Sequence, residues 1–325
     1  MKAVRAHQWC TPRELVIDDI DKPEPAEGQL LVHVSAAGLN FPDLLIITGK
    51  YQLKPALPFS PGFEIAGTVE KLGPGVTRFS EGQRVIAQVP VGGFAQYALA
   101  EESYTHAKPG LMSDEEGAAF PLVYQTAYFG LAYRGALQKG ETVLIHSAAG
   151  GVGLAALQIA RALGAGKIIG TVGSNDKLAL IRDNGADVAL NYETEDFVDV
   201  VKRETNGRGA DVIYDPVGGE IGEHSTKCIA FEGRLVLVGF TSGKFSSFIS
   251  NHVLVKNYSV IGLHWGSYRY NNPAKIEKGW NELLELHAGG GLNPIIGGRF
   301  HMEQIADAME FLASRKAVGK IVLYW

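Results

Sequence analysis

The stretch IHSAAGGVGLAALQIA, residues 145–160, decides the fold of this chain, because a glycine-rich turn separates a strand pattern from a helix pattern. The residues before the turn, 142–147, form an apolar run of the length of a buried parallel strand. After the turn, apolar residues recur with the spacing of one helix face, at Val152, Ala155, Ala156, Ile159, Ala160 and Leu163. A strand, a glycine turn and a helix in one βαβ unit predict a dinucleotide site, in which free amides at the helix start bind the pyrophosphate.

The turn differs from the G-x-G-x-x-G pattern at its first position, where Ala148 stands. Gly151 and Gly153 let the pyrophosphate and the sheet approach the backbone closely. We expect cofactor contacts from the four residues at the tip of the turn, Ala149, Gly150, Gly151 and Val152. The alternative is a turn that only connects a strand to a helix, and the strand patterns around it favour dinucleotide binding.

Strand and helix patterns alternate through the middle of the chain. The strand patterns cover 142–147, 167–172, 188–191, 210–214, 234–239 and 259–263, and the helix patterns cover 152–163, 176–184, 195–204 and 221–230. This alternation predicts an α/β fold with a doubly wound parallel sheet that is covered on both faces.

The two ends of the chain have a different character. Before residue 121, short strand patterns at 30–35, 65–69, 84–87 and 94–99 lie between Pro and Gly clusters, which predicts a mostly β unit. After Trp265, helix patterns at 273–287 and 302–315 and a strand pattern at 319–323 do not continue the alternation. We therefore expect two domains, a mostly β unit of residues 1–121 and 266–325 and a parallel-sheet unit of residues 122–265.

Composition excludes several classes of protein. The chain has 325 residues, of which 46% are hydrophobic and 20% charged, as in ordinary globular proteins. Its net charge of −5 is not that of a surface that binds nucleic acid. The longest apolar region is interrupted by Pro121, Gln125 and Gly130, and it is shorter than the roughly 20 residues of a membrane span. Cys10 and Cys228 have no spacing typical of a disulfide or metal site. We expect a soluble cytoplasmic protein with neither nucleic acid nor membrane as a partner.

The end of the strand at 167–172 indicates which dinucleotide is bound. NAD sites usually place an acidic residue there, whereas this chain reads Thr171-Val172-Gly173-Ser174, with Lys177 following. A hydroxyl and a cation suit the 2′-phosphate of NADPH, so Gly173, Ser174 and Lys177 are candidate cofactor residues. The alternative is that Ser174 only caps a helix and Lys177 is a solvated charge, and the nearby Asp176 counts against NADPH.

Several motifs in fixed order resemble the medium-chain dehydrogenase/reductase superfamily, and most closely its zinc-free quinone oxidoreductase branch, the zeta-crystallin-like proteins. They are AGLNFPD at 37–43 with GKY at 49–51, PGFE at 61–64, GGFAQY at 92–97, AAGGVG at 148–153 and GKIVL at 319–323. The resemblance implies a Rossmann NADP-binding domain of residues 122–265 and a GroES-like mostly β catalytic domain. In this branch the turn usually begins with alanine, so Ala148 supports the resemblance.

The resemblance also bears on metal binding. Zinc alcohol dehydrogenases of this superfamily place a cysteine ligand where this chain has Asn40, and a histidine where it has Phe63. A phenyl ring is no ligand, a carboxamide is a poor one, and the four-cysteine lobe is missing. We therefore expect no metal.

Without zinc, the resemblance implies hydride donation from NADPH to an acceptor such as a quinone. An activated alkene, an enone or enoyl thioester, is the alternative acceptor and needs a proton donor, for which Tyr51 is the candidate. Asn40 is expected near the nicotinamide, where it orients the cofactor carboxamide or the substrate. Structural alternatives are a core position for Tyr51 and local backbone bonding for Asn40. A third hypothesis is a non-catalytic NADPH-binding protein.

Further positions follow from the resemblance. Thr126 matches a threonine near the nicotinamide, and Tyr192 matches a tyrosine that flanks the 2′-phosphate beside Lys177. Strand carboxyl ends, where open α/β sheets bind ligands, carry Phe240, Thr241, Leu263 and Trp265. The segment 257–265 resembles an edge strand that pairs with a second copy, so we expect a homodimer.

Overall fold

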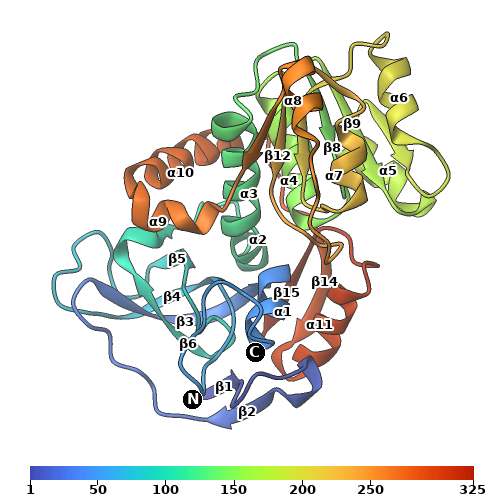
Figure 1. Ribbon diagram of the computed structural model, residues 1–325. Helices are drawn as coiled ribbons and strands as arrows, with labels where there is room; N and C mark the ends of the chain where they lie inside the picture. The colour runs from blue at the N-terminus through green and yellow to red at the C-terminus, as the bar shows by residue number, and fades with distance from the viewer. The chain divides into compact units, whose positions relative to one another are not determined.

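The structure is a computed structural model that describes residues 1–325 (Figure 1). Contacts divide the chain into two compact units, Met1–Leu122 with Pro294–Trp325, and Val123–Asn293. Residues 266–293, expected in the mostly β unit, therefore belong to the other unit. The reason is helix α10 (Pro273–Ala288), whose Gly279 lies so close to Phe129 that a Cβ there would be 2.8 Å from the ring.

The first unit contains one mostly antiparallel sheet in the order β14-β15-β3-β4-β5-β7, with β6 paired to β3. A separate antiparallel pair joins β1 to β2. The strands are β1 (Lys2–Arg5), β2 (Val16–Asp19), β3 (Gln29–Leu39), β4 (Glu64–Leu72), β5 (Arg84–Gln88), β6 (Tyr97–Glu101), β7 (Thr105–Ala107), β14 (Ile296–His301) and β15 (Lys320–Tyr324). The mostly β character predicted for this part of the chain is confirmed.

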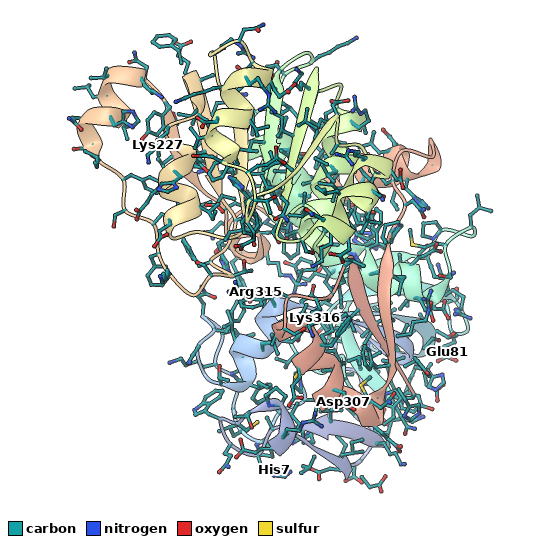
Figure 2. The ribbon with its side chains drawn as sticks, turned by 90° about the vertical axis from the view of Figure 1, so that its right-hand side faces the viewer. His7, Glu81, Lys227, Asp307, Arg315 and Lys316 are labelled. Atoms are coloured by element: carbon teal, nitrogen blue, oxygen red, sulfur yellow. The ribbon has the colours of Figure 1, made fainter.

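Short helices complete the first unit. They are α1 (Phe41–Ile47), α2 (Asp114–Ala119), α11 (Ile305–Ala313) and the 3-10 turns η1 (Pro12–Glu14), η2 (Glu102–Tyr104) and η6 (Met302–Gln304). Helix α11 is amphipathic: it buries Ile305, Ala308 and Met309, while Asp307 lies on its outer face (Figure 2). In the sheet, Leu39 of β3 pairs with Ile321 of β15, which brings the C-terminal strand beside the end of β3.

The second unit contains six parallel strands in the order β10-β9-β8-β11-β12-β13. They are β8 (Thr142–Ile145), β9 (Lys167–Val172), β10 (Val188–Asn191), β11 (Ala210–Asp215), β12 (Ile229–Leu237) and β13 (Ser259–Gly262). The doubly wound order confirms the predicted α/β class. Because all six strands are parallel, their carboxyl ends meet at one edge, which we call the carboxyl edge.

Helices lie between these strands along the chain, before the first of them and after the last (Figure 1). They are α3 (Pro121–Tyr128), the π-helix η3 (Phe129–Arg134), α4 (Gly151–Ala162), η4 (Asn175–Lys177), α5 (Leu178–Asp183), α6 (Phe197–Glu204), α7 (Glu220–Ser225), α8 (Ser250–Lys256), η5 (Trp265–Ser267), α9 (Tyr268–Asn271) and α10. None of the helices has the length and apolar character needed to cross a membrane.

One helix prediction is wrong in part. The pattern at 221–230 predicts a single helix, whereas α7 ends at Ser225 and β12 begins at Ile229. Ile229 and Ala230 continue the apolar pattern of the helix, but Ile229 pairs with Ala210 at the start of β11. Pairing with a neighbouring strand therefore overrides the local pattern.

Candidate functional site

The glycine turn connects β8 to α4 at the carboxyl edge. Gly150 is the N-cap residue and has no side chain, so it caps none of the first helical amides. The amides of Gly151, Val152 and Gly153 begin the helix, where no intrahelical carbonyl is available to them. A helix start of this kind offers free amides to an anion, and cofactor binding by these residues stays a prediction.

Gly153 and Ala148 show why the turn has its sequence. A Cβ on Gly153 would lie 2.7 Å from the Cα of Ala148 and inside contact distance of the Ser147 carbonyl, so only glycine fits. The methyl of Ala148 is buried against β9, where a Cβ on Gly170 would be 3.1 Å from it. Gly170 thus makes room for the alanine that replaces the first glycine of the pattern.

His146, just before the turn, is a buried support that the sequence did not single out. Its ring nitrogens lie 3.1 Å from the Thr171 hydroxyl and 2.9 Å from the Ser225 hydroxyl, which links β8 to β9 and α7. Burial lowers the pKa of His146 to about 4, so the ring is neutral at pH 7.

The residues predicted for the 2′-phosphate lie after β9 and β10. Gly173 and Tyr192 are neighbours, since a Cβ on Gly173 would be 2.7 Å from the tyrosine hydroxyl oxygen. Ser174 precedes the turn η4, which contains Asp176 and Lys177. A hydrogen bond from the Ser174 hydroxyl lowers the pKa of Asp176, and the charge of Lys177 adds to the effect. Ser174 is therefore hydrogen-bonded to Asp176, the carboxylate whose charge disfavours a 2′-phosphate at this position.

The remaining predicted residues of this unit follow strands or lie on α3. Thr241 donates its hydroxyl to the carbonyl of Pro216 at 3.0 Å, which joins the loops after β12 and β11. Phe240 covers Gly218 in the same loops. Leu263 and Trp265 follow β13 and are buried, and Thr126 is half-buried on α3.

In the first unit, Asn40 directly follows β3 and is the N-cap residue of α1. Its carboxamide nitrogen donates to Oε1 of Glu64 at 2.8 Å and to the Gly38 carbonyl at 3.2 Å. Its carboxamide oxygen accepts from the ammonium of Lys320 at 2.6 Å. The side chain is only 5% exposed, so most of its hydrogen-bonding capacity is used inside the unit.

Asp43 is a second buried carboxyl at this corner. It accepts from the amides of Asn40 at 2.8 Å and Gly62 at 3.1 Å, which ties the start of α1 to the segment before β4. Burial raises the pKa of Asp43 to about 7, although both amides and the charge of Lys320 oppose the rise.

Tyr51 follows α1 and packs its ring on Phe63, with ring centroids 5.7 Å apart. The ring is partly buried against the core of the first unit, as the structural alternative expects. The position also leaves part of the side chain accessible, as a proton donor requires. No group of three or more His, Cys, Asp or Glu side chains is placed to hold a metal ion.

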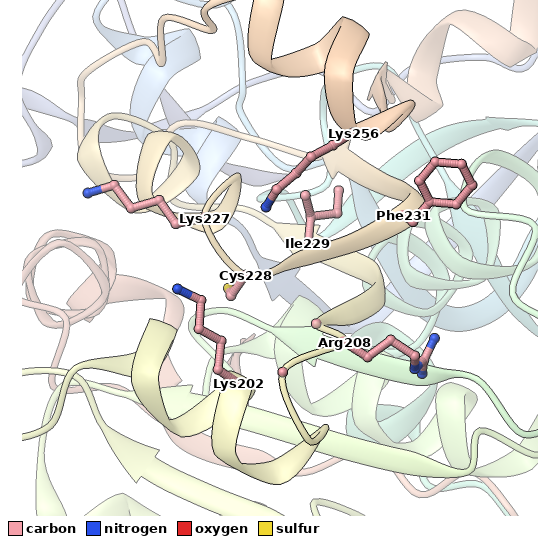
Figure 3. Close-up of a pocket in the computed structure, with 9 residues that line it drawn as sticks. Lys202, Arg208, Lys227, Cys228, Ile229, Phe231 and Lys256 are labelled. Atoms are coloured by element: carbon pink, nitrogen blue, oxygen red, sulfur yellow. The ribbon is translucent and has the colours of Figure 1, made fainter.

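A basic hollow of about 280 Å³ lies near the starts of β11 and β12, at the opposite ends of the strands from the glycine turn (Figure 3). Lys202 and Lys256 stand in the last turns of α6 and α8, where a positive charge complements the helix dipole. Lys256 donates to the carbonyl of Thr226 at 3.2 Å, and Lys227 follows α7. Lys202 and Lys256 have a structural explanation, and we assign the hollow no ligand.

Reasoning from sequence missed the partners of Asn40. Glu64 and Lys320 each belong to a quoted motif, but neither was singled out as a site residue. A usable signal was present, because both charged residues stand in apolar strand patterns, where a charge is buried only when it is paired.

Comparison with known proteins identifies relatives over the whole chain. Residues 26–110 match the family model of the alcohol dehydrogenase GroES-like domain, and residues 151–288 match that of the zinc-binding dehydrogenases. A quinone oxidoreductase-like protein 2 homolog from Nematostella vectensis is 37% identical over 325 residues, 99% of this chain and 88% of that protein.

Solved structures agree with these matches. The Escherichia coli quinone oxidoreductase complexed with NADPH is 32% identical, with a TM-score of 0.93 and 100% of both chains covered. The CurK enoyl reductase is 29% identical, with a TM-score of 0.90 over 99% of this chain and 98% of that one.

Proposed function

The chain belongs to the quinone oxidoreductases of the medium-chain dehydrogenase/reductase superfamily, and we propose that it is an NADPH-dependent reductase of quinones. The observation that carries the proposal is the glycine turn, with its uncapped amides at the start of α4. When bound, NADPH supplies a hydride.

The residues of the second unit fit this cofactor. The amides of Gly151 to Gly153 bind the pyrophosphate. They can hold this arrangement because Gly153 has no Cβ to collide with the backbone of Ser147 and Ala148. Lys177, Ser174 and Tyr192 bind the 2′-phosphate, and Lys177 offsets the charge of Asp176. The NADPH complex of the Escherichia coli relative supports this choice over NADH.

A quinone is the proposed acceptor because it accepts hydride without a metal, and Phe63 and the bonded Asn40 are poor metal ligands. An activated alkene is the second candidate acceptor, and two observations favour it: Tyr51 is placed on Phe63 at the surface of the core, and the CurK enoyl reductase is a structural neighbour. With that acceptor, the phenol of Tyr51 delivers a proton to the reduced substrate.

An acceptor screen with the wild type and Tyr51→Phe separates these functions. Purified protein is mixed with NADPH and a quinone, an enone or an enoyl thioester, and NADPH absorbance is followed. Under the quinone proposal, quinones react fastest and Tyr51→Phe retains most of the rate. Under the alkene alternative, Tyr51→Phe loses at least ~100-fold on alkenes. Binding of NADPH without turnover of any acceptor would instead indicate a non-catalytic protein.

We also propose a cytoplasmic homodimer that acts on a small molecule. Strand β13 is the last strand of its sheet, and its Val260 and Ile261 are half-buried at an edge with no further strand. An unpaired apolar edge favours pairing with a second copy. The two cysteines, Cys10 and Cys228, are free and buried, which is consistent with a reducing compartment.

A further inference from the structure

Glu64 and Lys320 form a buried ion pair beside Asn40. The ammonium lies 2.7 Å from Oε1 of Glu64, and the two side chains are 0% and 5% exposed. The residues are 256 positions apart, and they meet because β3 pairs with both β4 and β15. A Cβ on Gly38 would be 2.5 Å from the same carboxylate oxygen, so β3 has a glycine where the pair needs room.

Every hydrogen bond of the ammonium is made inside the unit. Lys320 donates to the carbonyl of Leu39 at 2.9 Å, to Oδ1 of Asn40 at 2.6 Å and to Glu64. The second carboxylate oxygen of Glu64 accepts from the amide of Leu122 at 2.7 Å. Buried ion pairs of this kind seldom add net stability over apolar side chains of similar volume, so stability alone does not explain the pair.

The pair determines which atoms of Asn40 face which neighbours. A flipped carboxamide would put its NH₂ group against the Lys320 ammonium and its oxygen against the Glu64 carboxylate, both repulsive. In the observed orientation both amide hydrogens are used, by Glu64 and Gly38. One lone pair on Oδ1 is the remaining capacity of the carboxamide. Asn40 is therefore able to accept a hydrogen bond from a ligand, but it has no hydrogen left to donate to a carbonyl or an oxyanion.

We propose that Glu64 and Lys320 are positioning residues, which hold Asn40 as a hydrogen-bond acceptor for the carboxamide NH₂ of the nicotinamide in the reductase reaction. A quinone has no hydrogen to donate, so the lone pair of Asn40 serves the cofactor and not this substrate. The inference rests on the proposed function, because it assigns these residues a part in that reaction. The ion pair acts through Asn40, and neither charged side chain touches the ligand.

The test compares Glu64→Gln/Lys320→Met, Asn40→Ala and the triple variant, with kcat and the KM for NADPH measured separately. The first variant removes both charges together and leaves no lone buried charge. Each of the first two variants should lower kcat by about 10- to 100-fold, while the KM for NADPH changes by less than about twofold. The triple variant should be no slower than the slower of the two, because the pair and Asn40 act as one unit.

Arg234→Met/Glu141→Gln is the matched control. It removes a partly buried ion pair of 2.6 Å in the second unit and should lower the melting temperature without changing kcat. A kcat of Asn40→Ala equal to that of the wild type would overturn the inference even if the charge-free variant fails to fold. The inference would also be overturned if the fold-loss of kcat in the triple variant equals the product of the losses in the other two variants. If none of the acceptors tested supports NADPH oxidation by the wild type, the proposed function fails and the positioning role fails with it.

Discussion

Gly153→Ala perturbs the glycine turn in the most direct way. The added Cβ would lie 2.7 Å from the Cα of Ala148 and 2.8 Å from its carbonyl carbon, and both neighbours are backbone atoms that have no rotamer to change. The first turn of α4 has to move by up to about 1 Å, at a cost of about 1–3 kcal/mol. For a unit of this size, each 1 kcal/mol lowers the melting temperature by about 2–4 °C.

Gly150→Ala is the control within the same turn. Its Cβ would be 3.4 Å from the nearest atom, the Ser147 carbonyl oxygen, and its φ of −77° and ψ of 171° suit alanine. It should cost less than about 1 kcal/mol. Thermal unfolding and fluorescence titration with NADPH are measured for both variants. Gly153→Ala should also weaken NADPH binding at least about tenfold, or 1.4 kcal/mol, because the amides move. Equal melting temperatures of the two variants, or an NADPH affinity of Gly153→Ala equal to that of the wild type, would refute the reasoning.

Three further predictions concern pH, cofactor choice and assembly. Because burial raises the pKa of Asp43 from 3.8 to about 7, the folded state keeps a proton that the unfolded chain releases. The free energy of unfolding should therefore fall by about 3 kcal/mol, relative to Asp43→Asn, as pH rises from about 4 to about 7. Unfolding free energies measured in urea that follow the same pH dependence in the two proteins would contradict this. Lys177→Ala should raise the KM for NADPH about tenfold and change the KM for NADH by less than about twofold. An equal rise of both KM values would show that Lys177 does not bind the 2′-phosphate. Ile261→Lys should convert a dimer to a monomer in sedimentation experiments, whereas a monomeric wild type would disprove pairing through β13.

Local patterns predicted the parallel sheet well where turn residues flank each strand. The predicted strands at 167–172 and 188–191 coincide with β9 and β10. The start of β12 was missed, because Ile229 and Ala230 extend the preceding helix pattern and only their pairing with β11 makes them a strand. The place of α10 was also missed, since the end of a βα alternation does not reveal which unit a later helix packs against.

The candidate site was predictable in its backbone and less so in its side chains. The glycine turn depends on neighbours in sequence, and its motif indicated the strand, the turn and the helix. The bonds of Asn40 depend on the pairing of β3 with β4 and β15, which joins residues far apart in the chain. Sequence alone suggested a role at the nicotinamide or a local backbone bond for Asn40. The structure shows the local bond, to the Gly38 carbonyl, and adds a buried ion pair that the sequence did not reveal.

The most direct test of the proposed function is the rate of NADPH oxidation by the purified wild type with a simple quinone, compared with the rate for NADH at the same concentration. We predict turnover with NADPH that is at least about tenfold faster than with NADH, since only NADPH carries the phosphate that Lys177 and Ser174 are proposed to bind. Equal rates with the two cofactors would contradict the proposed cofactor site, and no oxidation of either would contradict the proposed reductase.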